Sequence, residues 1–236
     1  VERLIRGGAD KICFVIGSAK SDILQYFGGE YGGARIAYVV QPRPAGLCDA
    51  IFRAAPLVAA DEPVAVGLPD TIWYPDDGLA RLPPDELAFL LFPVERPELF
   101  DAVLLDDRDG VVEIRVKQPD PGTRWIWGAF RMPGRTFHAL HALWEARGAR
   151  DEYLGPLVND WLAGGGRARG CRVGEAYVDV GTLHGYRAAM MMLAERTGDA
   201  PPVAAGEPAV APPRPAVPGT TAWPAPHAST SAPTRN

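Results

Sequence analysis

Short apolar runs alternate with helix-like stretches over the first 195 positions of the chain. The runs are apolar at most positions, which is typical of strands that are covered on both faces. They lie at 11–17, 34–41, 63–70, 87–94, 111–118, 124–132 and 176–181. This pattern predicts a sheet whose strands are buried between layers.

The stretches between these runs carry apolar residues at intervals of three and four, which predicts helices. Ser21 is placed to cap the first of them. A further helical pattern opens the chain and ends at the Gly7–Gly8 pair, a common way to stop a helix. The predicted internal helices lie at 21–27, 46–58, 137–148 and 183–196.

The order of these elements favours one fold class. Early alternation of strand and helix is typical of a doubly wound parallel sheet with helices on both faces. Between positions 87 and 132 the strands follow each other with few helical signals, which indicates antiparallel additions. We therefore expect an α/β fold with a mixed, mostly parallel sheet. A helix that leads into a buried strand normally follows a strand in this architecture, so we also expect the N-terminal strand of the fold to be missing.

The composition changes near residue 197. Positions 197–236 are mostly Pro, Ala, Gly, Ser and Thr, with too few large apolar residues to offset the entropy of ordering. We predict a folded domain over 1–196 and a disordered tail over 197–236 with extended polyproline character.

The charge, the lack of a long apolar run and the cysteine content argue against several classes of protein. A net charge of −5 in 236 residues argues against a general nucleic-acid surface. No apolar run approaches the roughly 20 residues of a membrane span, and the N-terminus is not a signal peptide. The cysteines are odd in number, without a C-x-x-C motif, which indicates reduced thiols and a cytoplasmic protein; they are Cys13, Cys48 and Cys171.

The end of the strand at 34–41 is a candidate binding segment, because ligands of open α/β sheets bind beyond the carboxyl ends of strands. Gln41 offers a donor and an acceptor that suit the edge of a pyrimidine base. Gly46, after an extended Pro42–Ala45 segment, leaves room for a flat ligand near a helix start, where anions are favoured. The same residues also fit a plain strand–turn–helix connection, and both interpretations stay open.

Two carboxylates stand out at the ends of apolar runs. Asp70 follows the run that begins at 63, and Asp179 lies within the last run, between Val178 and Val180. A carboxylate in such a strand is costly unless it is paired or bound to a cation, and Mg²⁺ prefers oxygen ligands. The alternatives are a helix cap for Asp70 and a turn residue for Asp179.

Lys117 ends the run at 111–118 and is placed to contact a phosphate as a point charge, or to be a solvated edge residue.

Four motifs in this order and spacing resemble the sugar-1-phosphate nucleotidyltransferases, with glucose-1-phosphate thymidylyltransferase as the closest pattern. They are VVQPRPAGLCDAI, VGLPDTIWYP, VKQP with WIWGAFRM, and YVDVGT. The resemblance spans roughly residues 1–195. It implies attack of a sugar 1-phosphate oxygen on the α-phosphorus of a nucleoside triphosphate, dTTP or UTP, with release of pyrophosphate. This chemistry depends on positioning and charge neutralisation.

The resemblance also implies the role of each matching residue. Asp70 and Asp179 would hold Mg²⁺, and Lys117 would contact the sugar phosphate. The nucleotide would meet Gln41, Pro42, Gly46 and Leu47, and the sugar would meet Gly128, Val116 and Asp101. Relatives of this kind often form homo-oligomers, so a homo-oligomer is a further expectation.

This sequence departs from the family pattern at several points. It contains no glycine-rich G-x-G-T-R-L loop, which cradles the triphosphate. Val116 stands where the family has a glutamate, Asp101 where it has a glycine, and Pro69 where it has a glycine. Without the loop, we expect these 236 residues to turn over slowly.

Two alternatives follow. One is a catalytically incompetent module that binds nucleotide or sugar phosphate and serves regulation or assembly. The other is a glycosyltransferase, which would normally carry a D-x-D motif; Asp70 and Asp76 are too far apart for one.

Overall fold

The computed structural model describes residues 1–197, and the predicted tail lies beyond them from residue 198 onward. The helices are α1 (Glu2–Arg6), α2 (Ser21–Phe27), α3 (Gly46–Phe52), α4 (Gly134–Ala146), α5 (Leu154–Ala163) and α6 (Leu183–Thr197). Short 3-10 helices are η1 (Ala55–Leu57), η2 (Gly78–Arg81) and η3 (Pro97–Leu99). The strands are β1 (Lys11–Gly17), β2 (Glu30–Tyr31), β3 (Ala34–Gln41), β4 (Pro63–Gly67), β5 (Thr71–Tyr74), β6 (Leu87–Pro93), β7 (Asp101–Leu105), β8 (Val111–Val116), β9 (Trp125–Pro133), β10 (Ala168–Cys171) and β11 (Ala176–Asp179).

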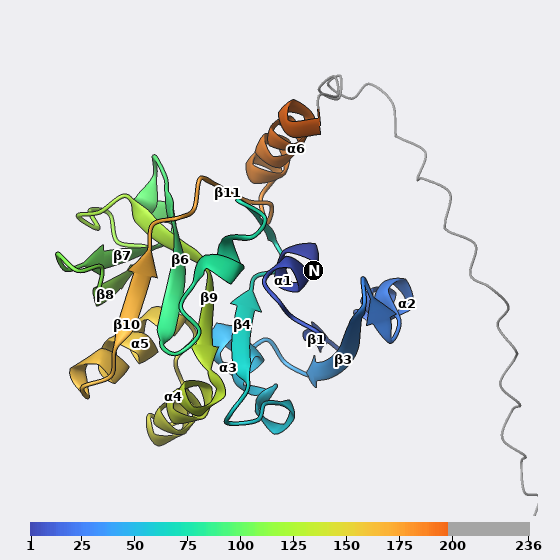
Figure 1. Ribbon diagram of the computed structural model, residues 1–236, viewed down its shortest axis with the longest axis horizontal. Helices are drawn as coiled ribbons and strands as arrows, with labels where there is room; N and C mark the ends of the chain where they lie inside the picture. Colours follow the sequence, from blue (N-terminus) through green and yellow to red (C-terminus); the bar gives the residue numbers. More distant parts are fainter. Residues whose placement is uncertain (198–236) are drawn as a thin grey trace, which may run out of the picture. The chain divides into compact units, whose positions relative to one another are not determined.

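The strands form three sheets, and Figure 1 shows their arrangement. Six strands make the largest sheet, in the order β10-β6-β9-β7-β8 with β4 also paired to β9. A second sheet has the order β1-β3-β2, and β5 pairs with β11. The mixed α/β class is confirmed. Within residues 1–197 the parallel pairs are β1–β3 and β10–β6 and the others are antiparallel, so parallel pairing is scarcer than we expected.

The strand predicted over 63–70 is in fact two elements. β4 ends at Gly67, and the chain turns before β5 begins at Thr71. Pro69 cannot donate to a sheet ladder, and the Thr71 hydroxyl donates to the Leu68 carbonyl at 3.1 Å, which closes the turn. Asp70 therefore lies in a turn rather than at the end of a long strand.

Other differences concern short elements and helix ends. The pattern missed β2, β5, β7, β10 and α5. Lys20, not Ser21, occupies the N-cap of α2, and no side chain caps that helix. The helix expected over 46–58 ends at Phe52, and Pro56 lies in the first turn of the separate helix η1.

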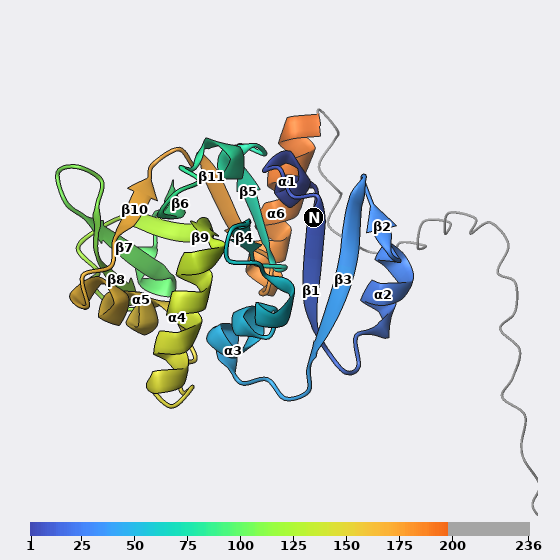
Figure 2. The ribbon, with the colours of Figure 1, turned by 60° about the horizontal axis from the view of Figure 1, so that its bottom comes forward.

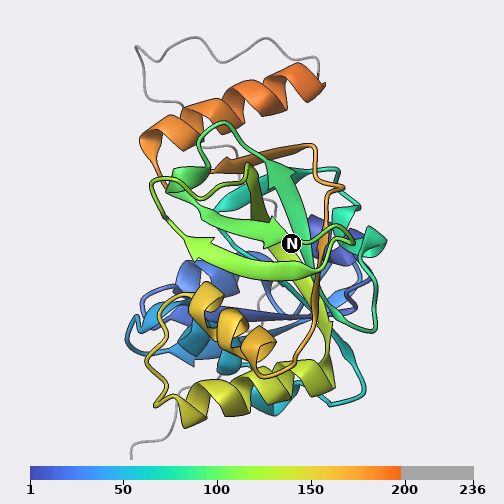
Figure 3. The same cartoon turned by 90° about the vertical axis from the view of Figure 1, so that its left-hand side faces the viewer.

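The main core lies between the large sheet and helices α3, α4 and α5. Figure 3 shows α4 and α5 together on one side of the green strands, with α6 on the other side. β6 is the most buried strand: its residues from 87 to 92 are all inaccessible to solvent or nearly so. Figure 2 shows β1 beside β3, with α2 next to β2; there Phe27 of α2 packs on Phe14 and Tyr31.

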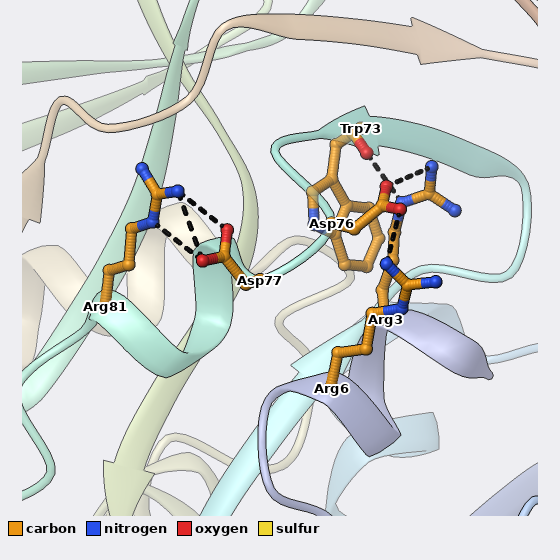
Figure 4. Close-up of polar contacts among 6 residues, drawn as sticks. All are labelled: Arg3, Arg6, Trp73, Asp76, Asp77 and Arg81. Atoms are coloured by element: carbon orange, nitrogen blue, oxygen red, sulfur yellow. Dashed lines mark hydrogen bonds and ion pairs between the residues drawn. The ribbon is translucent and has the colours of Figure 1, made fainter. Parts of the chain in front are cut away.

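A second cluster covers the other face of the large sheet and includes Trp73 of β5 and Leu79 of η2. Two arginines of helix α1 bind the segment at the end of β5, as Figure 4 shows. Arg3 donates to the Trp73 carbonyl at 2.6 Å and pairs with Asp76 at 3.1 Å, and Arg6 pairs with Asp76 at 2.9 Å. These contacts hold the far end of β5, the strand that begins next to Asp70.

The three cysteines are free thiols. Buried Cys48 lies against the Tyr153 carbonyl at 3.3 Å, and burial raises the pKa of its thiol to about 12. No helix of the described part of the chain combines the length and apolar character that a bilayer crossing requires.

Candidate active site

Asp70 and Asp179 meet at one end of the β5–β11 pair. Asp179 is the partner of Thr71 in the antiparallel register, and the Val180 amide donates to the Asp70 carbonyl at 2.7 Å. A Cβ on Gly181 would lie 3.0 Å from Asp179 Oδ1 and 3.4 Å from Asp70 Oδ2. Both carboxylates thus approach the same point, although they are far apart in sequence.

These two carboxylates have few internal partners. Asp179 Oδ1 accepts a hydrogen bond from the Gly181 amide at 2.7 Å. Within residues 1–197, the side chain of Asp70 takes part in no hydrogen bond or ion pair. Two adjacent negative charges with so little compensation favour a bound cation.

The donor set fits Mg²⁺ shared with a substrate. Mg²⁺ is commonly held by one or two carboxylates, while phosphates and water complete its shell. The described residues contain no group of three or more His, Cys, Asp or Glu side chains suited to a metal, so the other ligands would come from substrate and solvent. A metal role for Asp70 and Asp179 stays a prediction.

Tyr177 lies beside the two aspartates and was not predicted. Burial raises the pKa of its hydroxyl, and the negative charges of Asp179 and Asp70 raise it further. Its ring packs on Phe92 and Phe100, with centroid distances of 5.2 and 5.7 Å. The alternation within β11 was the available signal, because a residue two positions before Asp179 points to the same face.

Gly128 lies directly against the ring of Tyr177. A Cβ at this position would lie 2.4 Å from Tyr177 Cε2 and 2.8 Å from Phe92 Cε2. The absence of a side chain is therefore required by the packing of Tyr177 itself. The role of Gly128 in sugar binding stays a prediction.

Asp101, Val116 and Lys117 lie together at the ends of β7 and β8. Asp101 is the cross-strand partner of Val116, and the Lys117 amide donates to the Phe100 carbonyl at 3.0 Å. Lys117 has a φ of 46°, in the left-handed region of backbone conformation that residues other than glycine rarely adopt. Its ammonium lies over the Tyr153 ring, 5.1 Å from the centroid.

Burial raises the pKa of the Asp101 carboxyl to about 6, opposed by the charge of Lys117 and by the nearby indole N–H of Trp127. Ala102 of β7 pairs with Ile126 of β9, so residue 101 faces residue 127 across the two strands. Asp101 is thus a half-buried carboxyl, in the part of the site that we assigned to the sugar.

The segment Gln41–Leu47 is held by contacts of its own. The Gln41 amide donates to Asp49 at 2.7 Å and to the Gly46 carbonyl at 3.2 Å. Gly46 has a φ of +91°, and a Cβ there would lie 2.6 Å from the Cα of Glu152. The Leu47 amide donates to the Glu152 carbonyl at 2.8 Å. Pro42 is exposed.

These contacts explain Gln41 and Gly46 without a ligand, and the nucleotide role of Gln41, Pro42, Gly46 and Leu47 stays a prediction. They also join the two parts of the site. The amide of Leu47, at the start of α3, donates to the Glu152 carbonyl, and the ring of the neighbouring Tyr153 lies under the Lys117 ammonium group.

The mixed α/β fold is shared with solved nucleotidyltransferases. Solved structures support this class. The chain superimposes with a TM-score of 0.68 and 22% identity on a proposed glucose-1-phosphate thymidylyltransferase from Bacillus anthracis, over 81% of this chain and 79% of that one. It superimposes with a TM-score of 0.66 and 18% identity on the UTP-bound UGPase of Acinetobacter baumannii, over 82% and 80% of the chains. At these identities the likeness concerns the fold.

The sequence comparison points the same way. No family model matches the chain. The chain is 27% identical over 173 residues to the UTP–glucose-1-phosphate uridylyltransferase AglF of Haloferax volcanii, which is 70% of this chain and 70% of that protein. The predicted resemblance to the sugar-1-phosphate nucleotidyltransferases is confirmed by these relatives.

Proposed function

We propose that this protein joins a nucleoside triphosphate, UTP or dTTP, to a sugar 1-phosphate and releases pyrophosphate. The observation that carries the proposal is the convergence of Asp70 and Asp179 on one point beside Gly181. The similarity to a uridylyltransferase and to a UTP-bound enzyme agrees with a uridine or thymidine nucleotide.

In this proposal the chain positions two anionic substrates and offsets their charge. Asp70 and Asp179 would hold Mg²⁺, which would supply Lewis-acid neutralisation of charge on phosphate oxygens. Lys117 contacts the sugar phosphate with its ammonium group, which Tyr153 supports from below. The nucleophile is an oxygen of the sugar phosphate, so no nucleophilic side chain is needed.

The nucleotide base lies in this proposal at the segment Gln41–Leu47. The Gln41 amide nitrogen is engaged by Asp49 and Gly46, and no contact occupies its side-chain oxygen within residues 1–197. That oxygen can accept a hydrogen bond from the imide N–H of uracil or thymine. The same arrangement would not serve a base edge that offers only acceptors.

The test is pyrophosphate release from UTP or dTTP with glucose 1-phosphate and Mg²⁺. It is run on the protein as its gene encodes it and on residues 1–236. In the protein as encoded, Asp179→Asn and Asp70→Asn should each lower turnover by about 10²–10³-fold, because each removes charge stabilisation. Asp107→Asn is the matched control, since Asp107 is exposed in a turn.

Several outcomes separate the hypotheses. Turnover that survives both aspartate substitutions would remove this pair from the site. Fast turnover by residues 1–236 would show that a glycine-rich loop is not needed. Mg²⁺-dependent binding of nucleotide without turnover in either protein would favour the regulatory or assembly module instead.

A further inference from the structure

A cavity of about 430 Å³ lies where α1, the end of β5 and the last turn of α6 meet. Arg6 of α1 and Arg196 of α6 line it, together with residues 74–77 and Glu175. The side chains of Arg6 and Arg196 are 58% and 43% exposed, so a ligand in the cavity can reach both guanidinium groups.

The charges around this cavity are not balanced. Among the residues that line it and their ion-pair partners, four arginines stand against three carboxylates, although the whole chain has a net charge of −5. Asp77 and Arg81 offset each other at 2.9 Å. Asp76, by contrast, is shared by Arg3 at 3.1 Å and Arg6 at 2.9 Å, as Figure 4 shows. The positive excess therefore falls on the arginines around Asp76 and Tyr74.

The Tyr74 ring brings two of these guanidinium groups together. Arg196 lies over the ring at 3.6 Å from its centroid, and Arg3 lies 4.8 Å from the same centroid. Like charges at such a separation repel each other, so this cluster costs stability unless an anion offsets it. Glu175 gives Arg196 little compensation, because its carboxylate lies 3.9 Å away, beyond hydrogen-bond distance.

Both arginines of the cavity keep unused hydrogen-bond donors. Arg6 donates from Nη1 to Asp76 at 2.9 Å, and Arg196 donates no hydrogen bond within residues 1–197. Stacking on Tyr74 holds the planar Arg196 guanidinium in one orientation, so less entropy is lost when a ligand binds its edge. A guanidinium edge matches the oxygen atoms of a phosphate group in geometry and charge.

We propose that Arg6 and Arg196 form a binding site for the diphosphate group of a small molecule. Guanidinium groups from two helices contact the diphosphate together, and the anion supplies the negative charge that the cluster lacks. Glu175 gives way to the ligand at little cost, because exposed ion pairs of this kind contribute little to stability.

This site is separate from the candidate active site. Tyr74 pairs with Ala176 at one end of the β5–β11 ribbon, and Thr71 pairs with Asp179 at the other end. The three residue steps between these ends span about 10 Å. The inference therefore goes beyond the proposed function and does not rest on it.

The experiment measures binding of inorganic pyrophosphate to the 236-residue protein by calorimetry. Low ionic strength limits the screening of the exposed arginines, and EDTA prevents Mg²⁺ from drawing the anion to Asp70 and Asp179. The wild type should bind pyrophosphate. Arg6→Gln and Arg196→Gln should each weaken this binding by about 10–100-fold, because each removes charge-assisted hydrogen bonds.

Two further variants serve as controls. Arg187 is exposed on the same helix as Arg196 but does not line the cavity, so Arg187→Gln removes a positive charge without touching the site. Lys117→Ala removes the phosphate contact of the proposed active site. Both variants should bind pyrophosphate within about twofold of the wild type.

The same titrations with UDP distinguish a free diphosphate from one carried by a nucleotide. The ligand whose affinity falls more in Arg196→Gln is the better occupant of the site, and equal losses mean that the site recognises the diphosphate group alone.

Three results would overturn the inference: no pyrophosphate binding by the wild type, unchanged binding in both Arg6→Gln and Arg196→Gln, or a loss of binding in Lys117→Ala that equals theirs. The last would place pyrophosphate in the candidate active site. Should Arg6→Gln not fold, as judged by circular dichroism, Arg196→Gln decides.

Discussion

The two parts of the candidate site differ in how their polar groups are satisfied. In the base segment, Gln41–Leu47, the side-chain amide and the backbone of Leu47 find partners within the protein. In the acidic part, defined by Asp70, Asp101 and Asp179, the carboxylates have few partners or incomplete ones. The contacts of the first part stabilise the fold itself. In the second part, burial penalises the charge of Asp101, whereas Asp70 is exposed, and carboxylates with few internal partners tend to cluster at functional sites.

The motif residues of the two parts differ in how far packing alone accounts for them. A glycine or glutamine in a motif can be required by packing, as Gly46 is by its contact with Glu152. The half-buried carboxyl of Asp101 is harder to explain by packing, because burial penalises its charge. The acidic part is therefore the stronger evidence for function, and substitutions in the two parts should have opposite effects on stability.

The largest expected effect is on the base segment. Gly46→Ala should destabilise the protein by about 2–4 kcal/mol, because it combines a positive φ with a collision against the Glu152 backbone. Urea unfolding measures this. Gly165→Ala is the control: it has a similar φ of +89° but open space around it, so it isolates the conformational cost. Equal losses in the two variants would show that the contact with Glu152 is not what demands glycine.

A smaller effect of opposite sign is expected in the acidic part. Asp101 has a pKa of about 6 in the folded protein, against 3.8 for an ordinary aspartate. The folded state thus holds the proton more tightly, so the contribution of Asp101 to stability falls as pH rises from 3.8 to 6. Asp101→Asn should therefore stabilise the protein at pH 8 by about 1–3 kcal/mol and change little at pH 4.

Urea unfolding at the two pH values checks the Asp101 prediction, with Asp107→Asn as the exposed control on the following turn. A loss of stability at pH 8 would mean that the carboxylate is well satisfied in the folded state. The contrast between the two parts of the site would then be wrong.

The smallest effect is expected at Gln41. Gln41→Ala should cost about 0.5–1.5 kcal/mol in urea unfolding, because it removes the hydrogen bonds to Asp49 and Gly46 while Asp49 keeps its ion pair with Arg53. Gln118→Ala is the control at an exposed position. If Gln41→Ala leaves stability unchanged and weakens nucleotide binding, Gln41 serves ligand binding and does not stabilise the fold.

Local patterns in the sequence predicted much of the fold. The strands at 11–17 and 34–41, the helices at 21–27 and 183–196, and the antiparallel strands between 87 and 132 follow from apolar periodicity. The short strands β5, β7 and β10 were missed, because four or five residues in a strand carry too little periodicity to be told from a loop.

The sequence predicted which residues form the candidate site better than it predicted how they are arranged. The residues themselves pointed to Asp70 and Asp179, because a carboxylate at the end of an apolar run or within it is costly, whereas Asp101 was named only through the family resemblance. It did not reveal Tyr177 or the unpaired N–H of Trp127, because both are ordinary aromatic residues in apolar strands.

Periodicity and the cost of a charge in an apolar run were enough to predict the α/β class, most of the long elements, and the carboxylates Asp70 and Asp179. The folded chain was needed to show that Asp70 and Asp179 meet, that glycine is required by packing at 46 and 128, and that residue 101 faces residue 127 across the β7–β9 pair. Those facts depend on contacts between segments far apart in the chain, and local sequence carries no record of such distances.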